Sequence, residues 1–180
     1  MARIPQITDD AATGDAADLF TAIKAKVGMV PNLYRVAANQ PAALKAMLGI
    51  GETLGGGNFD PKTREAIALA VAGANGCDYC ASAHSAISAN LKVEAEEIAS
   101  RLAGHSTDPR VDAIVKLAVK VNDTKGFVAD NDLADAKAAG LSDADIVEVV
   151  ANVAQNVFTN YLNHVADTDI DFPVVKAKAA

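Results

Sequence analysis

The feature of the chain that most constrains its fold is a regular succession of signals that start and end helices, with almost no strand-like alternation. Asp60 and Pro61 form one such start, because aspartate is a preferred N-cap and proline is favoured at the first helical position. Residues 61 to about 75 follow, and they are apolar on nearly every side after Glu65. This pattern predicts a helix that is largely buried.

The same signals predict helices along the rest of the chain. Ser142 can cap the last of them, with Asp145 three residues later in a shortened capping box and with Leu141 and Ile146 as a hydrophobic staple. A cap followed by an apolar helix therefore occurs twice, which is compatible with a duplicated helical unit. The expected helical segments lie within residues 15–28, 30–41, 41–57, 61–75, 77–90, 93–104, 108–123, 131–140 and 142–167.

The composition favours close-packed helices over a β-sandwich or a barrel. Hydrophobic residues make up 51% of the 180 residues, but aromatic residues make up only 4%, and tryptophan is absent. Sheet proteins usually contain more β-branched and aromatic side chains. We therefore expect one all-α domain over residues 1–180.

Charge and hydropathy exclude several classes of partner. The net charge is −7 without a basic stripe, and the lysines near the C-terminus are expected to be a solvated tail, so no nucleic-acid partner is expected. The longest apolar run, residues 66–74, is much shorter than the roughly 20 residues that span a bilayer, so no membrane partner is expected. The N-terminus lacks the apolar region of a signal peptide, which predicts a cytoplasmic protein.

Both cysteines of the chain lie in one short motif, Cys77-x-x-Cys80-x-x-x-His84. If residues 77–90 form a helix, these three side chains lie on one face. Both cysteines would then lie in the first turn, where the helix dipole favours a thiolate, and His84 could take the proton of Cys80. A peroxide attacked by Cys80 would leave a sulfenic acid, with which Cys77 could form a disulfide.

Glu65 is the next candidate for the same site. If the chain reverses at Gly76 and the flanking helices pack antiparallel, His84 lies opposite roughly residue 69, and Glu65 is one helical turn further, about 6 Å along the axis. A carboxylate at that position could orient His84 and accept its proton, directly or through a water molecule.

These residues resemble the active-site pattern of the AhpD-like branch of the carboxymuconolactone decarboxylase family. The match is sharpest at residues 60–90, and residues 30–41 and 160–173 are also similar to peroxidase-related members. The resemblance implies an all-α antiparallel bundle with its core motif at about residues 60–104, assembled as a homo-oligomer of three or six chains.

The resemblance also implies a function, that of an antioxidant alkylhydroperoxidase without metal or other cofactor. Cys80 would be the attacking thiol and Cys77 the resolving thiol, with His84 and Glu65 as a proton relay. The substrate would be an organic hydroperoxide, and a dithiol donor, for which the family suggests a lipoylated protein, would reduce the disulfide. Tyr79 stands where some peroxidase members have a second histidine.

The residues leave other interpretations open. The two cysteines could be small buried hydrophobic residues, or they could bind zinc with His84, although no fourth ligand is evident. A lactone decarboxylase-like lyase would use His84 and Glu65 without thiol chemistry. A non-enzymatic oligomeric redox sensor would use the disulfide alone. His164 and the asparagines near it either face the pocket or cap the last helix.

Overall fold

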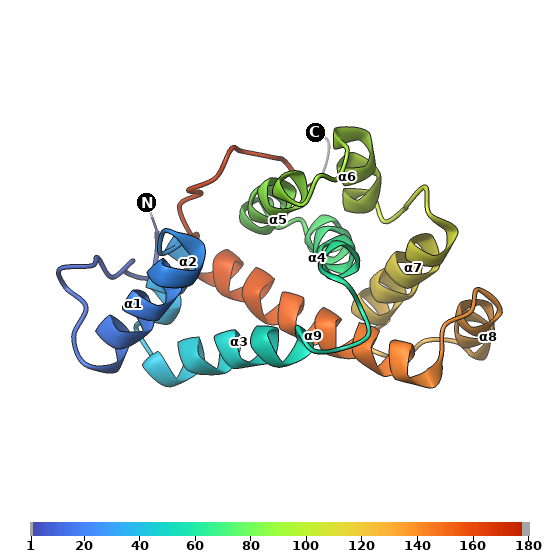
Figure 1. Ribbon diagram of the computed structural model, residues 1–180, viewed down its shortest axis with the longest axis horizontal. Coiled ribbons are helices and arrows are strands. Elements are labelled where there is room, and N and C mark those ends of the chain that lie inside the picture. The colour runs from blue at the N-terminus through green and yellow to red at the C-terminus, as the bar shows by residue number, and fades with distance from the viewer. Residues whose placement is uncertain (1, 178–180) are drawn as a thin grey trace.

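The structure, a computed structural model, describes residues 2–177 and confirms the all-α prediction. No strand occurs within this range. Figure 1 shows how the helices are arranged. The nine helices of the described residues are α1 (Asp15–Val27), α2 (Asn32–Ala37), α3 (Pro41–Leu54), α4 (Pro61–Asn75), α5 (Asp78–Asn90), α6 (Ala95–Leu102), α7 (Pro109–Thr124), α8 (Asp130–Ala138) and α9 (Asp143–Ala166).

Helix α4 is the centre of the fold. It packs against α5, α6, α7 and α9, and every residue from 66 to 73 is buried. The predicted N-cap is present, because the Asp60 carboxylate accepts a hydrogen bond of 2.7 Å from Thr63 N. Gly73 is required for the packing on α6, because a Cβ at this position would overlap the Leu102 carbonyl oxygen. The absence of a side chain at one position thus sets how closely these two helices approach.

The core has two main parts, at the two ends of the long helix α9 (Figure 1). Toward one end, α1, α2 and α3 enclose a cluster that includes Phe20, Leu44 and Met47. Toward the other end, α4, α7, α8 and α9 enclose a cluster that includes Ile67, Ile114 and Val149. Helix α9 contacts α2, α3, α4, α5 and α7, so it connects the two parts.

The first turn of α9 has the predicted cap. The hydroxyl of Ser142 accepts a hydrogen bond from Asp145 N, and the Asp145 carboxylate accepts one of 2.9 Å from Ser142 N. Arg110 Nη2 on α7 donates a further bond of 3.0 Å to this carboxylate. The cap therefore also joins α9 to α7.

An unexpected property of α9 is a stripe of buried polar residues. Their spacing of four, four, four and three residues places them on one face of the helix, which is turned toward the interior. These residues, called the α9 polar stripe below, are Glu148, Asn152, Asn156, Asn160 and Asn163.

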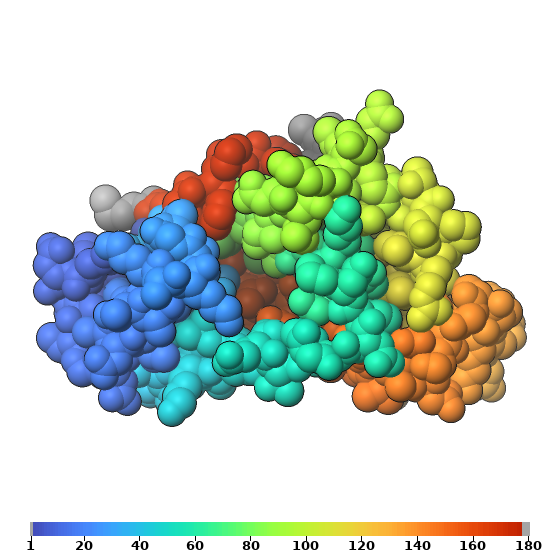
Figure 2. Space-filling view, in the orientation of Figure 1, coloured from blue at the N-terminus to red at the C-terminus, as the bar shows by residue number. Residues whose placement is uncertain are grey.

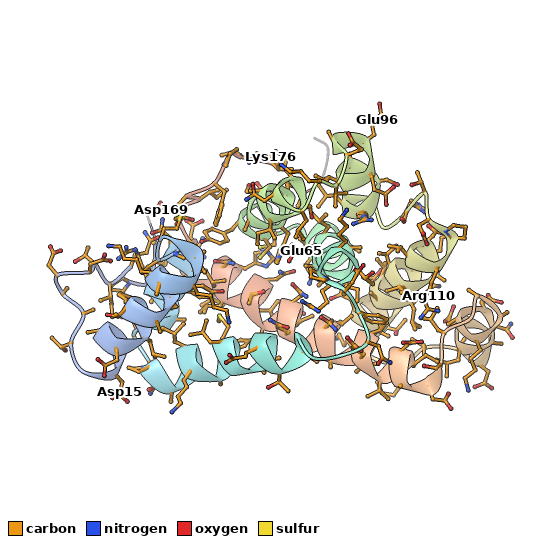
Figure 3. All side chains as sticks on the ribbon, viewed as in Figure 1. Asp15, Glu65, Glu96, Arg110, Asp169 and Lys176 are labelled. Atoms are coloured by element: carbon orange, nitrogen blue, oxygen red, sulfur yellow. The ribbon has the colours of Figure 1, made fainter. Side chains whose placement is uncertain are left out.

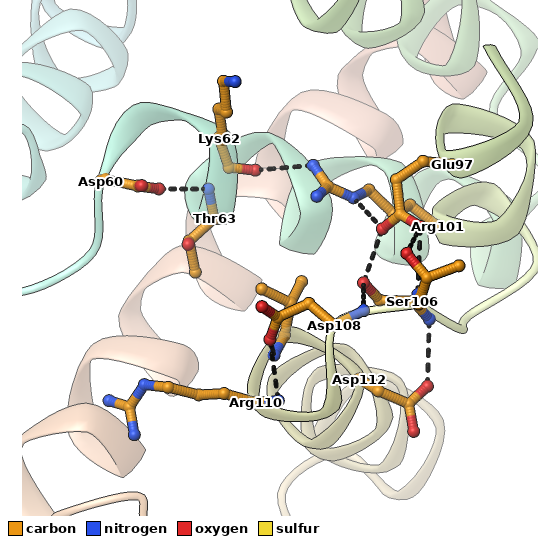
Figure 4. Close-up of polar contacts among 11 residues, drawn as sticks. Asp60, Lys62, Thr63, Glu97, Arg101, Ser106, Asp108, Arg110 and Asp112 are labelled. Carbon is orange, nitrogen blue, oxygen red and sulfur yellow. Dashed lines mark hydrogen bonds and ion pairs between the residues drawn. The ribbon is translucent and has the colours of Figure 1, made fainter. Parts of the chain in front are cut away.

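A polar network fixes the connection from α6 to α7 (Figure 4). The Glu97 carboxylate accepts bonds from Arg101 Nε at 2.8 Å, from Ser106 Oγ at 2.5 Å and from Thr107 N at 3.0 Å. Arg101 also donates to the Lys62 carbonyl at the start of α4. Burial raises the pKa of Glu97, but these hydrogen bonds outweigh it and lower the pKa to about 2.

We predict that Glu97→Gln lowers the free energy of unfolding by about 2 kcal/mol at neutral pH, because hydrogen bonds to a charged acceptor are lost. The pKa of Glu97 is depressed in the folded protein, so this stabilisation is complete above the unfolded-state pKa of about 4.5 and is lost as the pH falls toward 2. Urea unfolding between pH 7 and pH 2.5 measures it. Glu96→Gln, at an exposed position on the same helix, is the control and should change stability little. Equal losses in the two variants would contradict the prediction.

Candidate active site

The two cysteines lie at the reversal between α4 and α5. The chain reverses at Gly76, whose φ of 68° is in the left-handed region that glycine adopts without strain. Cys77 N then donates to the Ala72 carbonyl at 2.9 Å, and Cys77 becomes the N-cap of α5. The predicted reversal is confirmed, while the helix begins at Asp78, one residue later than expected.

The sulfur atoms of Cys77 and Cys80 are in contact. Both residues are free and buried, and their Sγ atoms are 2.7 Å apart, within hydrogen-bond distance. Hydrogen bonds from the Cys80 thiol and from Cys80 N, together with the charge of His84, lower the pKa of Cys77. Cys77 is therefore the sulfur that first becomes a thiolate.

The expectation that the helix start makes both thiols more acidic is wrong for Cys80. The pKa of Cys80 is raised, because its proton is held in the hydrogen bond to Cys77 and because the residue is buried. Two adjacent sulfurs cannot both ionise easily, since the second charge would be repelled by the first. Of the two sulfurs, Cys77 thus favours the thiolate form, and Cys80 favours the thiol form.

His84 and Glu65 meet between the antiparallel helices α5 and α4. The distance from His84 Nδ1 to Glu65 Oε2 is 2.8 Å, so the contact is direct. Their side chains are 22% and 16% exposed. Burial lowers the pKa of His84, but the charge of Glu65 and its hydrogen bond outweigh this, so that the pKa is raised. An imidazolium at His84 is thereby favoured beside the Cys77 thiolate.

Two asparagines of the α9 polar stripe reach the cysteines; the sequence left open whether the asparagines of this segment face the pocket or cap the helix. Asn163 Nδ2 donates to Cys80 Sγ at 3.3 Å, and the carboxamides of Asn163 and Asn160 both act to lower the pKa of Cys80. Of the alternatives left open for this segment, the asparagines face the site, whereas His164 is exposed. The four-residue spacing of asparagines in an apolar helix was the signal available in the sequence.

Tyr79 has a structural role at this position. Its hydroxyl donates to Asp171 at 2.8 Å and accepts from Leu33 N at 3.1 Å, and its ring is perpendicular to that of Phe172. Burial raises the pKa of Tyr79, so the phenol keeps its proton. The residue that stands where some relatives have a histidine therefore ties α5 to α2 and to the C-terminal segment.

The C-terminal segment is not the solvated tail that the sequence indicated. Residues 168–177 run along α5 (Figure 1). Val175 N donates to Ser82 Oγ at 2.9 Å, and Ala177 N and Lys176 Nζ donate to the carboxylate of Asp78, at 2.9 and 2.7 Å. Lys178 and the residues after it lie outside the described range. Figure 3 shows Lys176 and Asp169 on this segment and Glu65 near the middle of the molecule.

A cavity of about 370 Å³ leads to the cysteine pair. Its walls come from α1, α2, α3, α5 and α9, and Figure 2 shows the hollow between these elements with α9 at its floor. Cys80 and His84 line it, but Cys77 does not. The other lining side chains are mostly apolar and include Ile23, Leu33, Tyr34, Met47, Leu48, Ile87 and Phe172.

No group of three or more His, Cys, Asp or Glu residues that could hold a metal ion occurs between residues 2 and 177. In the same range, no helix is long and apolar enough to cross a membrane.

Comparison with known proteins finds a match to one family over part of the chain. Residues 41–120 match the profile of the carboxymuconolactone decarboxylase family. A peroxidase-related protein from Ralstonia eutropha JMP134, described as an alkylhydroperoxidase AhpD core, superposes with a TM-score of 0.84 at 23% identity, covering 94% of this chain and 92% of that one. A peroxidase-related protein from Silicibacter sp. TM1040 superposes with a TM-score of 0.80 at 22% identity, covering 94% of each chain.

A third similar structure is that of the debrominase Bmp8, as a cysteine-to-alanine variant in complex with 2,3,4-tribromopyrrole. Its TM-score is 0.78 at 20% identity, and the match covers 95% of this chain and 94% of that one. At these identities the structural neighbours establish the fold and not the activity. No curated protein matches the chain.

We predict that Glu65→Gln lowers the pKa of His84, because the charge that raises it is removed while the burial that lowers it remains. A raised pKa means that the pair stabilises the fold below the unfolded-state value of about 6.5, and that this stabilisation is lost as the pH rises through the folded-state pKa. An NMR titration of the imidazole protons measures the change. An unchanged His84 titration would contradict the prediction.

Proposed function

We propose that the chain is a thiol-dependent peroxidase that reduces organic hydroperoxides, because residues 41–120 match the carboxymuconolactone decarboxylase family and the fold is similar to that of a protein described as an alkylhydroperoxidase AhpD core. One observation carries the proposal: a cysteine that lines an apolar cavity is in contact with a second cysteine that favours the thiolate form. A buried thiol pair used only for packing would need neither the cavity nor the adjacent ion pair of His84 and Glu65.

In the proposed reaction, Cys80 attacks the hydroperoxide, because it is the sulfur that the cavity reaches. Its proton moves across the contact to Cys77, which leaves the charge on Cys80. The Cys80 sulfur then bonds to the terminal oxygen of the hydroperoxide, the oxygen–oxygen bond breaks, and the leaving alkoxide takes a proton from the His84 imidazolium to form an alcohol. Cys80 is now a sulfenic acid.

The second half of the reaction closes the disulfide. Cys77 returns its proton to His84 and attacks the Cys80 sulfur, so that a sulfur–sulfur bond forms and hydroxide leaves. Hydroxide takes the proton from His84 and becomes water. The sum is the reduction of one hydroperoxide to alcohol and water by the two thiols. Glu65, 2.8 Å from His84, would hold the imidazole in place through both proton transfers.

Renewal of the two thiols requires a separate dithiol donor, and a lipoylated protein is the donor class that we propose. The cavity opens beside exposed Val27 and Ile87, which offer an apolar surface for the arm of such a donor.

A homo-oligomer of three or six chains also remains a proposal. The exposed apolar side chains on one side of α9 are the surface that it would cover; they are Val147, Val150, Phe158, Tyr161 and Val165.

We expect Cys80→Ser to abolish catalytic turnover of cumene hydroperoxide with a dithiol donor. Cys77→Ser should still reduce one equivalent and should accumulate a sulfenic acid on Cys80, because no thiol is left to resolve it. Donor oxidation and mass spectrometry after dimedone trapping measure the two effects. Full turnover by Cys80→Ser would refute the mechanism.

The same variants separate the alternatives. A lactone decarboxylase-like lyase would keep its activity after both thiols are alkylated and lose it in Glu65→Gln. A redox sensor would form the disulfide reversibly and change its assembly or partner binding, without measurable peroxide turnover.

A second candidate function is the reductive removal of bromide from a brominated aromatic compound. It is favoured by the apolar cavity, in which Tyr34 and Phe172 could contact a flat ring next to Cys80, and by the likeness in fold to a debrominase crystallised with a tribromopyrrole. The two thiols would supply two electrons, a carbon–hydrogen bond would replace a carbon–bromine bond, and bromide would leave as the disulfide forms.

This candidate predicts that the reduced protein releases one bromide from 2,3,4-tribromopyrrole for each Cys77–Cys80 disulfide formed. Ion chromatography and quantification of free thiols measure the two products. No bromide release by protein that still reduces cumene hydroperoxide would eliminate it.

A further inference from the structure

We propose that Asn160 and Asn163 form a carboxamide pair that selects Cys80, rather than Cys77, as the nucleophile. The pair would do so by holding negative charge on the Cys80 sulfur and then on the oxygen that this sulfur acquires. The proposal rests on the thiol chemistry proposed above. In the reduced site the thiolate form is favoured on Cys77, whereas the cavity reaches Cys80.

Asn163 already contacts the sulfur concerned. Its Nδ2 donates to Cys80 Sγ at 3.3 Å, and the residue is only 4% exposed. A thiol sulfur is a weak acceptor, whereas a thiolate is a strong one, so this hydrogen bond strengthens when Cys80 loses its proton. The same contact is therefore weak in the resting state and strong in the attacking state.

Asn160 is held in place through the oxygen atom of its carboxamide. Its Oδ1 accepts a bond of 3.0 Å from Asn75 Nδ2 at the end of α4. Asn75 and Asn122 on α7 are joined by two hydrogen bonds, of 3.1 and 3.0 Å, which fix the orientation of Asn75. With its oxygen bound in this way, Asn160 has only its Nδ2 group left to donate to another partner.

The Nδ2 group of Asn160 is the strongest support for the proposal. Asn160 is 0% exposed, and its Nδ2 has no hydrogen-bond partner among residues 2–177 of the reduced protein. A buried donor without a partner costs roughly 1–3 kcal/mol. Asn160 is one of the two carboxamides whose donors would favour a Cys80 thiolate. A charge on Cys80, or an oxygen bound to it, would supply the missing partner.

The two carboxamides and the hydrogen bond from Cys80 to Cys77 therefore act in opposite directions. The contact between the sulfurs disfavours a negative charge on Cys80. The carboxamides stabilise a charge on Cys80 and so offset part of the free energy needed to place it there. A site without them would keep its charge on Cys77, outside the cavity. The pair thus acts on which sulfur attacks and leaves the total charge of the site unchanged.

The test uses Cys77→Ser, in which Cys80 is the only cysteine. The thiol pKa of Cys80 is read from the pH dependence of its alkylation by iodoacetamide, followed by intact-protein mass spectrometry. We expect Asn160→Ala and Asn163→Ala each to raise this pKa by about one unit, which is about tenfold less thiolate at a given pH. Asn163→Asp, which preserves the shape of the side chain, should raise it further because a carboxylate repels the thiolate, and circular dichroism verifies the fold of each variant.

Asn152→Ala is the matched control, since Asn152 is 2% exposed on the same stripe and donates to the Glu148 carbonyl of its own helix. It should leave the thiol pKa of Cys80 unchanged. An unchanged pKa in either Asn160→Ala or Asn163→Ala, or an equal rise in Asn152→Ala, overturns the proposal. Alkylation requires no hydroperoxide, so the two proposals fail separately: the expected shifts in a protein without peroxidase turnover would refute the proposed function alone.

Discussion

The packing of α4 in the middle of the molecule is the constraint on which the rest of the structure depends. A helix buried along residues 66–73 needs neighbours on every side, and α5, α6, α7 and α9 supply them. One of these contacts is possible only because Gly73 leaves room for the Leu102 carbonyl. The reversal at Gly76 then starts α5 directly against α4, which brings the Glu65 carboxylate to His84. The same packing that stabilises the core thus assembles the candidate site.

The electrostatics of the site follow from one shared proton. Cys77 receives hydrogen bonds from the thiol and the backbone of Cys80, and both stabilise its charge. Cys80 provides one of those bonds and faces the cavity, so the more acidic sulfur and the more accessible sulfur are different residues. Chemistry at the cavity therefore depends on how easily the proton crosses the 2.7 Å between the sulfurs. The charge of His84 favours a thiolate on Cys77, whereas the hydrogen bond from Asn163 favours one on Cys80, so the two residues have opposite effects on that balance.

Much of the fold and part of the site could be predicted from local rules. The caps at Asp60 and Ser142 involve neighbours within three residues, so the sequence contains all the partners that they need. The placement of Glu65 beside His84 also follows from helix geometry, once a glycine at residue 76 is taken as a reversal. The acidity of Cys80 could not be predicted in this way, because it depends on which of two adjacent buried sulfurs keeps its proton. The roles of these residues in catalysis stay predictions.

The sequence by itself determined the helices, their ends and the shared face of Cys77, Cys80 and His84, because each depends on residues at most a few turns apart. Only the tertiary structure decided what surrounds that face. Asn163 reaches Cys80 across 83 positions of the chain, and Asp171 reaches Tyr79 across 92. No periodicity records such contacts, because they arise when α9 and the C-terminal segment pack beside α5. The cavity has the same origin, since its walls come from helices that are distant in sequence and meet only in the folded protein.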